Sequence, residues 1–428
     1  MKKRSAFIFR VQVILKLKAF KLNILKTPYE KNLKSWLVPA FFAAVAVYSC
    51  SGNDVYEAKP IAQDEYPGIL AAFGSNINLS SLENYANQPK PFYITRDNTM
   101  GNPITDKGAT LGRMLFYDKN LSKNNTVSCS SCHKQELAFG DNVVASVGVN
   151  GNTGRHAMRL VNARFGNEMK FFWDERAANL EAQTTFPIQD HNEMGFSGIN
   201  GDGNLQDLIA KLQNIRYYQE MFRYVYGDAA VTQTRIQNAL AQFIRSIQSF
   251  DSRYDAGRAA SANDQQPFAN FTAQENQGKN LFLAPPVFDA SGNRTGGGLG
   301  CAACHAAPEF DIDPNSKNNG IIGKISGTGI DITNTKAPSL RNVTNGSGTE
   351  NGPFMHTGNF TTLQQVIGHY ANINLAPGNT NLDPRLAPNG NGQKLNLTAQ
   401  ETNAIIAFLK TLSGSDVYTN KKWSNPFK

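Results

Sequence analysis

A chain of 428 residues is too long for one small hydrophobic core and predicts two domains of ordinary size. Its formal charge is +8, from 42 Lys and Arg against 34 Asp and Glu, but ten of the basic residues and only one acidic residue lie in residues 1–49. The rest of the chain therefore has 32 basic and 33 acidic residues and a charge of −1. This balance excludes the clustered positive surface that nucleic-acid binding requires.

Residues 1–49 have the pattern of a bacterial lipoprotein signal peptide. Basic residues precede an apolar run from Leu37 to Val47, which is too short to span a bilayer and stops at Cys50. The sequence before Cys50 resembles a lipoprotein cleavage box, so we expect Cys50 to be lipidated. The alternatives are a buried hydrophobic helix or, because this leader is long, a translation start nearer Lys31. The interpretation predicts a periplasmic, lipid-anchored protein attached to the cell envelope.

The remaining chain predicts an all-α protein with long loops. Apolar residues recur at helical spacing in 205–215 and 236–247, and capping boxes predict helices after Thr272 and Thr398. No sustained alternation marks a strand, and loops rich in Gly, Asn and Pro fill 289–300, 313–335 and 376–394.

A polar stretch at 259–266, closed by Pro267, is typical of a linker. It predicts four parts: the signal peptide, a tether with an N-terminal helical extension at 50–100, and two domains at 101–258 and 267–428.

The four other cysteines form two Cys-x-x-Cys-His motifs, which end at His133 and His305. This is the signature of c-type haem attachment, in which Cys129 and Cys132, or Cys301 and Cys304, bond covalently to one haem. A zinc site, a redox dithiol and disulfides are the alternatives. Zinc would need further Cys or His at ligand spacing, and the sequence has no such cluster.

His133 and His305 are then the proximal iron ligands. A strong sixth ligand gives an electron-transfer haem, whereas an open position allows peroxide to bind. The four remaining histidines are His156, His191, His356 and His369.

Long motifs surround both haem signatures. Those around the first are Leu111–Asp118, Ala138–Asp141, Phe171–Ala177, Leu180–Gln183 and Glu193–Gly195; those around the second are Lys336–Val343 and Pro353–Gly358. In these motifs the chain resembles the bacterial di-haem cytochrome c peroxidase family, which includes MauG-like enzymes. The resemblance implies two cytochrome c-like domains in tandem, an N-terminal peroxidatic one and a C-terminal electron-transfer one.

The resemblance also implies roles for four residues. Glu193 matches the catalytic carboxylate, which relays a proton between the peroxide oxygens, although a lone Glu is more often a solvated surface acid. Trp173 matches the tryptophan between the haems, an electron bridge, although core packing is the usual fate of Trp. Phe172 would line the peroxide pocket, and Gln183 would support it.

The sequence departs from the family at the distal side of the first haem. The family's labile histidine is replaced by Val149, so this haem is either open from the start or ligated by His156. His156 also aligns near an asparagine that helps hold an inter-haem calcium, and a structural role is the third alternative. Calcium is thus in doubt, although carbonyls near Asn351 and Pro353 could contribute.

The sixth ligand of the second haem also departs from the usual pattern. Where typical peroxidases have methionine, this chain has Tyr370, as MauG-like enzymes do. An anionic oxygen ligand stabilises ferric iron. His369 and Met355 are rival ligands.

These observations predict a di-haem c-type peroxidase that reduces hydrogen peroxide to water with electrons from a small cytochrome or cupredoxin. The first alternative is a MauG-like oxidase of a protein or organic substrate, and the second is a non-catalytic electron carrier. The lipid anchor would attach the protein to the membrane, no nucleic-acid partner is expected, and a homodimer is compatible with this function.

Overall fold

The computed structural model describes residues 65–428 except 168, 313 and 315. The predicted signal peptide, Cys50 and the tether lie outside the described residues. By its contacts the chain from Ile61 to Lys428 forms one compact unit. None of the helices in the described part is long and apolar enough to cross a membrane.

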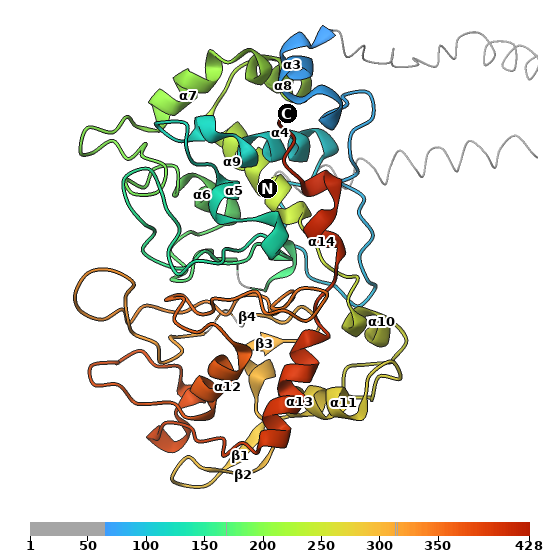
Figure 1. The fold of residues 1–428 in the computed structure, drawn as a ribbon, viewed down its shortest axis with the longest axis vertical. Helices are drawn as coiled ribbons and strands as arrows, with labels where there is room; N and C mark the ends of the chain where they lie inside the picture. The colour runs from blue at the N-terminus through green and yellow to red at the C-terminus, as the bar shows by residue number, and fades with distance from the viewer. Residues whose placement is uncertain (1–64, 168, 313, 315) are drawn as a thin grey trace, which may run out of the picture. The chain divides into compact units, whose positions relative to one another are not determined.

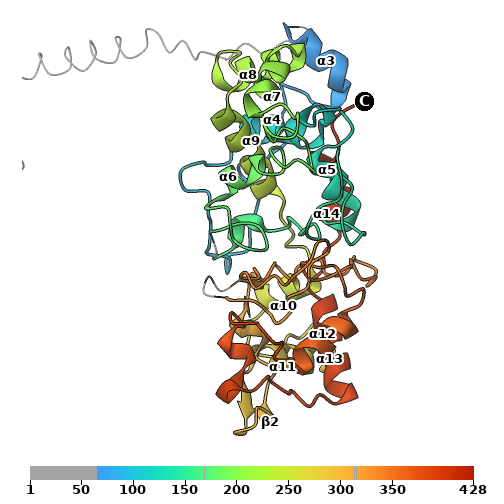
Figure 2. The same ribbon diagram turned by 90° about the vertical axis from the view of Figure 1, so that its left-hand side faces the viewer.

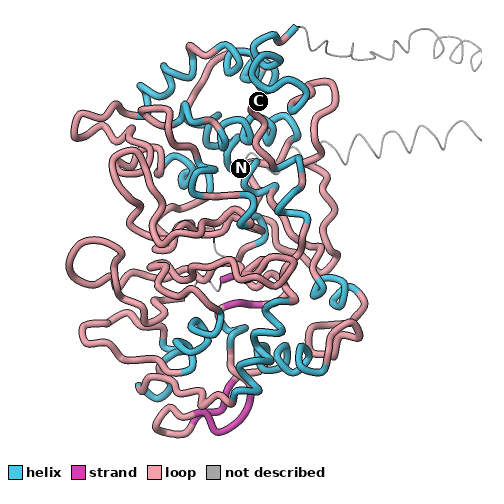
Figure 3. Tube along the Cα trace, viewed as in Figure 1, coloured by secondary structure: helices cyan, strands magenta, loops and turns pink. Residues whose placement is uncertain are grey.

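Helices are the dominant regular structure, joined by long irregular segments (Figures 1 and 3). The α-helices are α3 (Pro67–Phe73), α4 (Asp106–Tyr117), α5 (Cys129–Cys132), α6 (Leu180–Thr185), α7 (Leu205–Gln213), α8 (Arg216–Tyr226), α9 (Gln233–Ser246), α10 (Arg253–Ala259), α11 (Ala273–Leu283), α12 (Leu363–Ala371), α13 (Ala399–Lys410) and α14 (Asp416–Thr419).

The strands form two short antiparallel hairpins that the expectation of an all-α fold did not include. One pairs β1 (Pro286–Phe288) with β2 (Arg294–Gly297), and the other pairs β3 (His305–Ala306) with β4 (Asp311–Ile312). Strands of two to four residues cannot show a period-two pattern in the sequence, which is why they were not predicted.

The helices predicted from periodicity and capping are confirmed. The stretches 205–215 and 236–247 form α7 and α9, while Thr272 and Thr398 cap α11 and α13 with both bonds of a capping box. The predicted N-terminal helical extension is helical only in α3 and the 3-10 turn Gly74–Asn76 within the described residues.

Two hydrophobic clusters contain most of the buried side chains. The first is built mainly on α4, α7, α8 and α9, and the second on α11, α12 and α13. The C-terminal segment with α14 belongs to the first cluster, because Val417 and Trp423 are fully buried in it (Figures 1 and 2). Tyr254, before the predicted linker, belongs to the second. The division at 258 and 267 stays a prediction.

Several features of the first cluster recur in the second. Gly112 of α4 meets the Ala239 carbonyl of α9, and Gly278 of α11 meets the Ala404 carbonyl of α13, so closely that a Cβ at either glycine would collide with the oxygen. Each half also has a turn closed by a single β-bridge, Phe171 to Ala177 and Phe354 to Phe360. The chain therefore contains a structural repeat.

The two repeats exchange equivalent hydrogen bonds. The His156 amide donates to the His356 carbonyl at 2.8 Å, and the Lys336 amide donates to the Trp173 carbonyl at 2.7 Å. Trp173 and His356 each lie two residues after the first bridge residue of their turn, and their ring centroids are 6.2 Å apart. These paired contacts place the two turns against each other.

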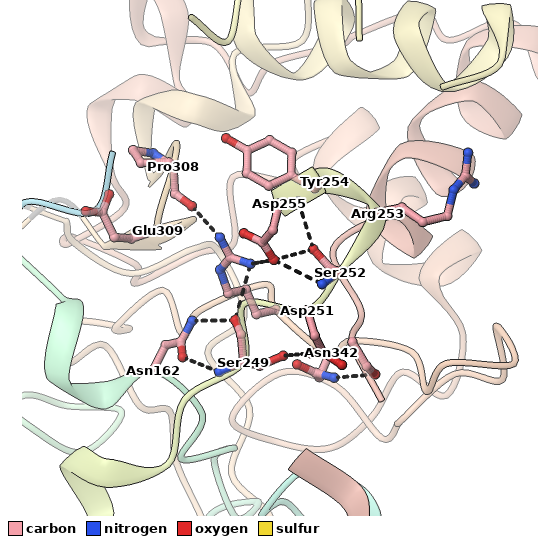
Figure 4. A network of polar contacts seen from close by, with 12 residues as sticks. Asn162, Ser249, Asp251, Ser252, Arg253, Tyr254, Asp255, Pro308, Glu309 and Asn342 are labelled. Atoms are coloured by element: carbon pink, nitrogen blue, oxygen red, sulfur yellow. Dashed lines mark hydrogen bonds and ion pairs between the residues drawn. The ribbon is translucent and has the colours of Figure 1, made fainter. Parts of the chain in front are cut away.

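A buried arginine links several segments near this region. Arg341 is fully buried and donates to Asp255 at 2.9 Å, to the Pro308 carbonyl at 3.0 Å and to the Ser249 carbonyl at 3.4 Å. Ser249 in turn exchanges two hydrogen bonds with Asn162, as Figure 4 shows. The segment between α9 and α10 is thereby fixed to both sequence halves.

Candidate functional site

The first Cys-x-x-Cys-His motif forms α5 and its C-cap. The Ser128 amide donates to the Ser131 hydroxyl at 3.0 Å and fixes the start of the helix. Nδ1 of His133, the C-cap, lies 3.1 Å from the Phe139 carbonyl oxygen and so donates to it. Burial lowers the pKa of His133, so the imidazole is neutral, as a metal ligand must be.

A cavity of about 510 Å³ adjoins this motif. Cys132 and His133 line it on one side, and Phe172, Trp173, Gln183 and Glu193 line it elsewhere. A smaller cavity of about 70 Å³, bounded by both Cys129 and Cys132, lies beside it. All four residues that the resemblance implies for catalysis are thus brought together.

The second motif begins in a 3-10 helix, Cys301–Ala303, and ends in β3. Cys301, Cys304 and His305 line a second cavity of about 470 Å³ with largely apolar walls. Burial lowers the pKa of His305 to about 4, so this imidazole is also neutral.

The geometry separates haem attachment from its alternatives. None of the four motif cysteines forms a disulfide, and no group of three or more His, Cys, Asp or Glu within the described residues could hold zinc. Burial raises the pKa of Cys129 and of Cys301 to about 12, the opposite of a reactive redox dithiol. Paired thiols and a neutral imidazole beside a cavity fit a covalently bound haem, and this arrangement occurs twice.

One wall belongs to both cavities. It includes His156, Arg159, Trp173 and Lys336. The Trp173 indole N–H donates to the His156 carbonyl at 2.7 Å, which fixes the ring in this wall. Its π-system therefore adjoins both cavities.

Glu193 supplies a titratable carboxyl to the first cavity. Burial raises the pKa of Glu193 to about 7; repulsion from Asp190 adds to this, and attraction to Arg176 opposes it. The group can therefore both accept and return a proton near neutral pH.

An aromatic and cationic stack lies beside Glu193. Phe172 has a positive φ of 72°, and its ring stacks on Phe186 with centroids 5.7 Å apart. The guanidinium carbon of Arg176 lies 3.6 Å from the Phe172 ring centroid. Phe172 and Arg176 of this stack line the first cavity.

Two of the three candidate iron ligands for the second haem line the same cavity and share a hydrogen-bond donor. Tyr370 and Met355 line the second cavity, and the Asn319 amide donates to the Tyr370 hydroxyl at 3.4 Å and to the Met355 sulfur at 3.6 Å. His369 does not line this cavity, and its Nε2 lies 2.9 Å from the Asn319 carbonyl oxygen. No sequence motif singled out Asn319, because only long-range packing brings it to these side chains.

Comparison with known proteins shows which family the chain resembles. The model of the di-haem cytochrome c peroxidase family matches residues 106–263. The methylamine utilization protein MauG of Methylophilus methylotrophus is 28% identical over 330 residues, 74% of this chain and 85% of that protein. Cytochrome c551 peroxidase of Nitrosomonas europaea is 28% identical over 319 residues, 72% of this chain and 80% of that protein.

A solved structure agrees with these relatives. The crystal structure of a MauG-like protein associated with microbial copper homeostasis is 29% identical and superposes with a TM-score of 0.61, covering 79% of this chain and 99% of that one. By these comparisons the chain is similar to the di-haem cytochrome c peroxidase family. The predicted resemblance is thus confirmed, and the family implies two c-type haems.

The first cavity has no side-chain iron ligand at the position that corresponds to Tyr370 of the second cavity. Tyr370 follows the bridge residue Phe354 by 16 residues, and Pro187 follows the equivalent Phe171 by 16 residues. Both line their cavities, but proline has no atom that could bind iron. The repeat therefore provides a candidate ligand on the second side and none at the matching place on the first.

The two other candidates for the distal side of the first haem are placed as follows. The Val149 amide donates to the Glu193 carbonyl at 2.9 Å, so its segment packs on the Glu193 loop. His156 lines both cavities, and its Nδ1 lies 2.9 Å from the Val143 carbonyl oxygen. Its role as a distal ligand stays a prediction.

The expected calcium site is not supported. The Asn351 carbonyl, a possible calcium ligand in the sequence analysis, accepts a hydrogen bond of 3.2 Å from Nη1 of Arg159. Pro353 lines the second cavity instead. A fixed guanidinium beside this carbonyl would repel a divalent cation.

Proposed function

We propose that this protein is a di-haem peroxidase that reduces hydrogen peroxide to water with two electrons from a small cytochrome or cupredoxin. The observation that carries the proposal is the Glu193 carboxyl, with a pKa of about 7, in the cavity that also contains the His133 imidazole. Its support is the family, in which cytochrome c peroxidases recur among the relatives.

The residues that line the first cavity would have different roles in the reaction. When bound, haem iron would supply the binding site for peroxide and the electrons for its reduction. Glu193 would take a proton from the near peroxide oxygen and return it to the far one, and two further protons from solvent, with the two donor electrons, complete two waters per peroxide. Phe172 would exclude water, and Gln183, from α6, would orient the substrate.

Trp173 would connect the cavities, because it lines both and is held by the His156 carbonyl. We propose that the C-terminal repeat is the electron-entry domain and that both repeats are cytochrome c-like domains. The repeated glycine crossings and bridged turns support this arrangement.

The variant Glu193→Gln tests the peroxidase function. It should keep both haems and their spectra, while peroxide turnover with a reduced donor falls by roughly 10²- to 10⁴-fold, the usual loss for a positioned proton carrier. Unchanged turnover would remove Glu193 from the mechanism. A non-catalytic carrier would show negligible turnover in both proteins.

A MauG-like oxidase is the second candidate, favoured by Tyr370 in the second cavity. Burial raises the pKa of Tyr370 to about 12, so its phenol loses the proton only beside a strong cation such as ferric iron. An enzyme of this kind would consume peroxide to oxidise a protein or organic substrate without oxidising a donor cytochrome.

We also propose that the protein is exported and held by lipid at Cys50 on the periplasmic side of the envelope, where a homodimer is compatible with its activity. The apolar run before Cys50 supports this location. Cys50→Ser should move the protein from the membrane to the soluble fraction, and an unchanged distribution would contradict the anchor.

A further inference from the structure

Arg159 lies in the wall that the two cavities share. Its side chain passes over Gly140, where an added Cβ would come within 2.8 Å of the Arg159 Cγ. The guanidinium carbon lies 5.9 Å from the centroid of the Phe354 ring. Glycine at 140 therefore makes room for a long cationic side chain between the two sites.

The half-buried Arg159 guanidinium has few partners in the described chain. Its one hydrogen bond to the described residues joins Nη1 to the Asn351 carbonyl, and Nε is buried with no partner. No carboxylate of the described chain forms an ion pair with it, whereas the buried Arg341 and Arg245 contact Asp255 and Glu181.

The side chain nevertheless stays charged. Burial lowers the pKa of Arg159 to about 10, which is still far above neutral pH. A cation held partly out of water without a counter-charge is destabilising, so the folded chain gains from an anion at this place. The planar guanidinium is suited to a carboxylate, which it can bind through two parallel hydrogen bonds.

We propose that Arg159 binds a propionate carboxylate of a haem held in one of the two cavities. The inference rests on the proposed di-haem function and adds a residue that anchors one of the haems. The contact would keep the propionate ionised and hold the haem against the shared wall. The positive charge would also disfavour the ferric state and so raise the midpoint potential.

The test compares haem-loaded wild type with Arg159→Gln, Arg159→Lys and the control Arg216→Gln. Arg216 has an exposed side chain, pairs with the buried Glu220 and lines neither cavity, so the control removes the same charge elsewhere. Haem number by mass spectrometry, the propionate bending band in resonance Raman spectra and the two midpoint potentials are measured.

Arg159→Gln should keep two haems and shift the propionate band. It should also lower at least one midpoint potential by about 59 mV, a tenfold change for a one-electron couple. Arg159→Lys should recover part of both effects, and Arg216→Gln should show neither.

Three results would overturn the inference. With two haems present, an unchanged Raman band and unchanged potentials in Arg159→Gln would show that no haem carboxylate is bound. Wild-type potentials that follow chloride or phosphate concentration would indicate a free-anion site, and potentials that shift with a calcium chelator would indicate a metal. Absence of two haems in the wild type would instead contradict the proposed function.

Discussion

In the proposed mechanism Glu193 transfers the proton, and its raised pKa makes a prediction about pH. The carboxylate, not the acid, can accept a proton from peroxide, so kcat/KM for peroxide should rise with pH, with an inflection near pH 7, and level off above it. Glu193→Gln should lose the inflection as well as the rate. A pH profile from 5 to 9 checks this, and an inflection that survives in Glu193→Gln would assign it to another group.

Tyr370 is the candidate sixth ligand of the second haem in the proposed function. We expect the wild type to lack the sulfur-to-iron band of methionine ligation, and Tyr370→Met to introduce that band and raise the midpoint potential. The matched variant Met355→Leu should leave the optical spectrum unchanged. A methionine band in the wild type that Met355→Leu abolishes would show that Met355 is the ligand.

The sequence could predict the residues that belong to motifs but not those that only packing brings together. Cys129, His133 and their counterparts are contiguous, and Glu193 is marked by its neighbours. Asn319, Arg159 and Pro187 carry no local signal. Asn319 reaches Tyr370 from 51 residues away, and Arg159 reaches Asn351 from 192 residues away.

At the scale of elements, the close helix crossings give a stability prediction. Gly278→Ala would drive a Cβ into the Ala404 carbonyl of α13 and should cost about 1–3 kcal/mol in the free energy of unfolding. The control is Gly368→Ala in α12, where nothing lies within 4 Å. It should stabilise by about 0.5–1 kcal/mol, because alanine is the better helix former. Urea unfolding measures both, and equal effects would contradict the crossing.

Element prediction from the sequence worked where amphipathic stripes or capping boxes are local, as in α9 and α13. It failed for the short strands and for the helical extension, of which the described residues contain α3 and one 3-10 turn. It also could not place the C-terminal segment. Trp423 enters the first cluster, where its indole N–H donates to the Ser246 carbonyl at 3.1 Å, 177 residues away.

At the scale of the whole molecule, the repeat predicts two independent attachment sites. The intact mass of the holoprotein should exceed that of the polypeptide by two haems. The double variant Cys301→Ser with Cys304→Ser should keep one, because the first motif lies in its own cluster and cavity. A wild type with one haem or none, from cells with a working haem-attachment system, would contradict the repeat as a haem-binding unit.

The most direct test of the account is the ratio of donor oxidised to peroxide consumed. Haem-loaded protein is mixed with excess reduced cytochrome c and a limiting, known amount of hydrogen peroxide. A peroxidase should oxidise about two cytochromes per peroxide, because each donor gives one electron and each peroxide takes two. Consumption of peroxide without oxidation of the donor, in protein shown to contain two haems, would contradict the peroxidase function and favour the MauG-like oxidase.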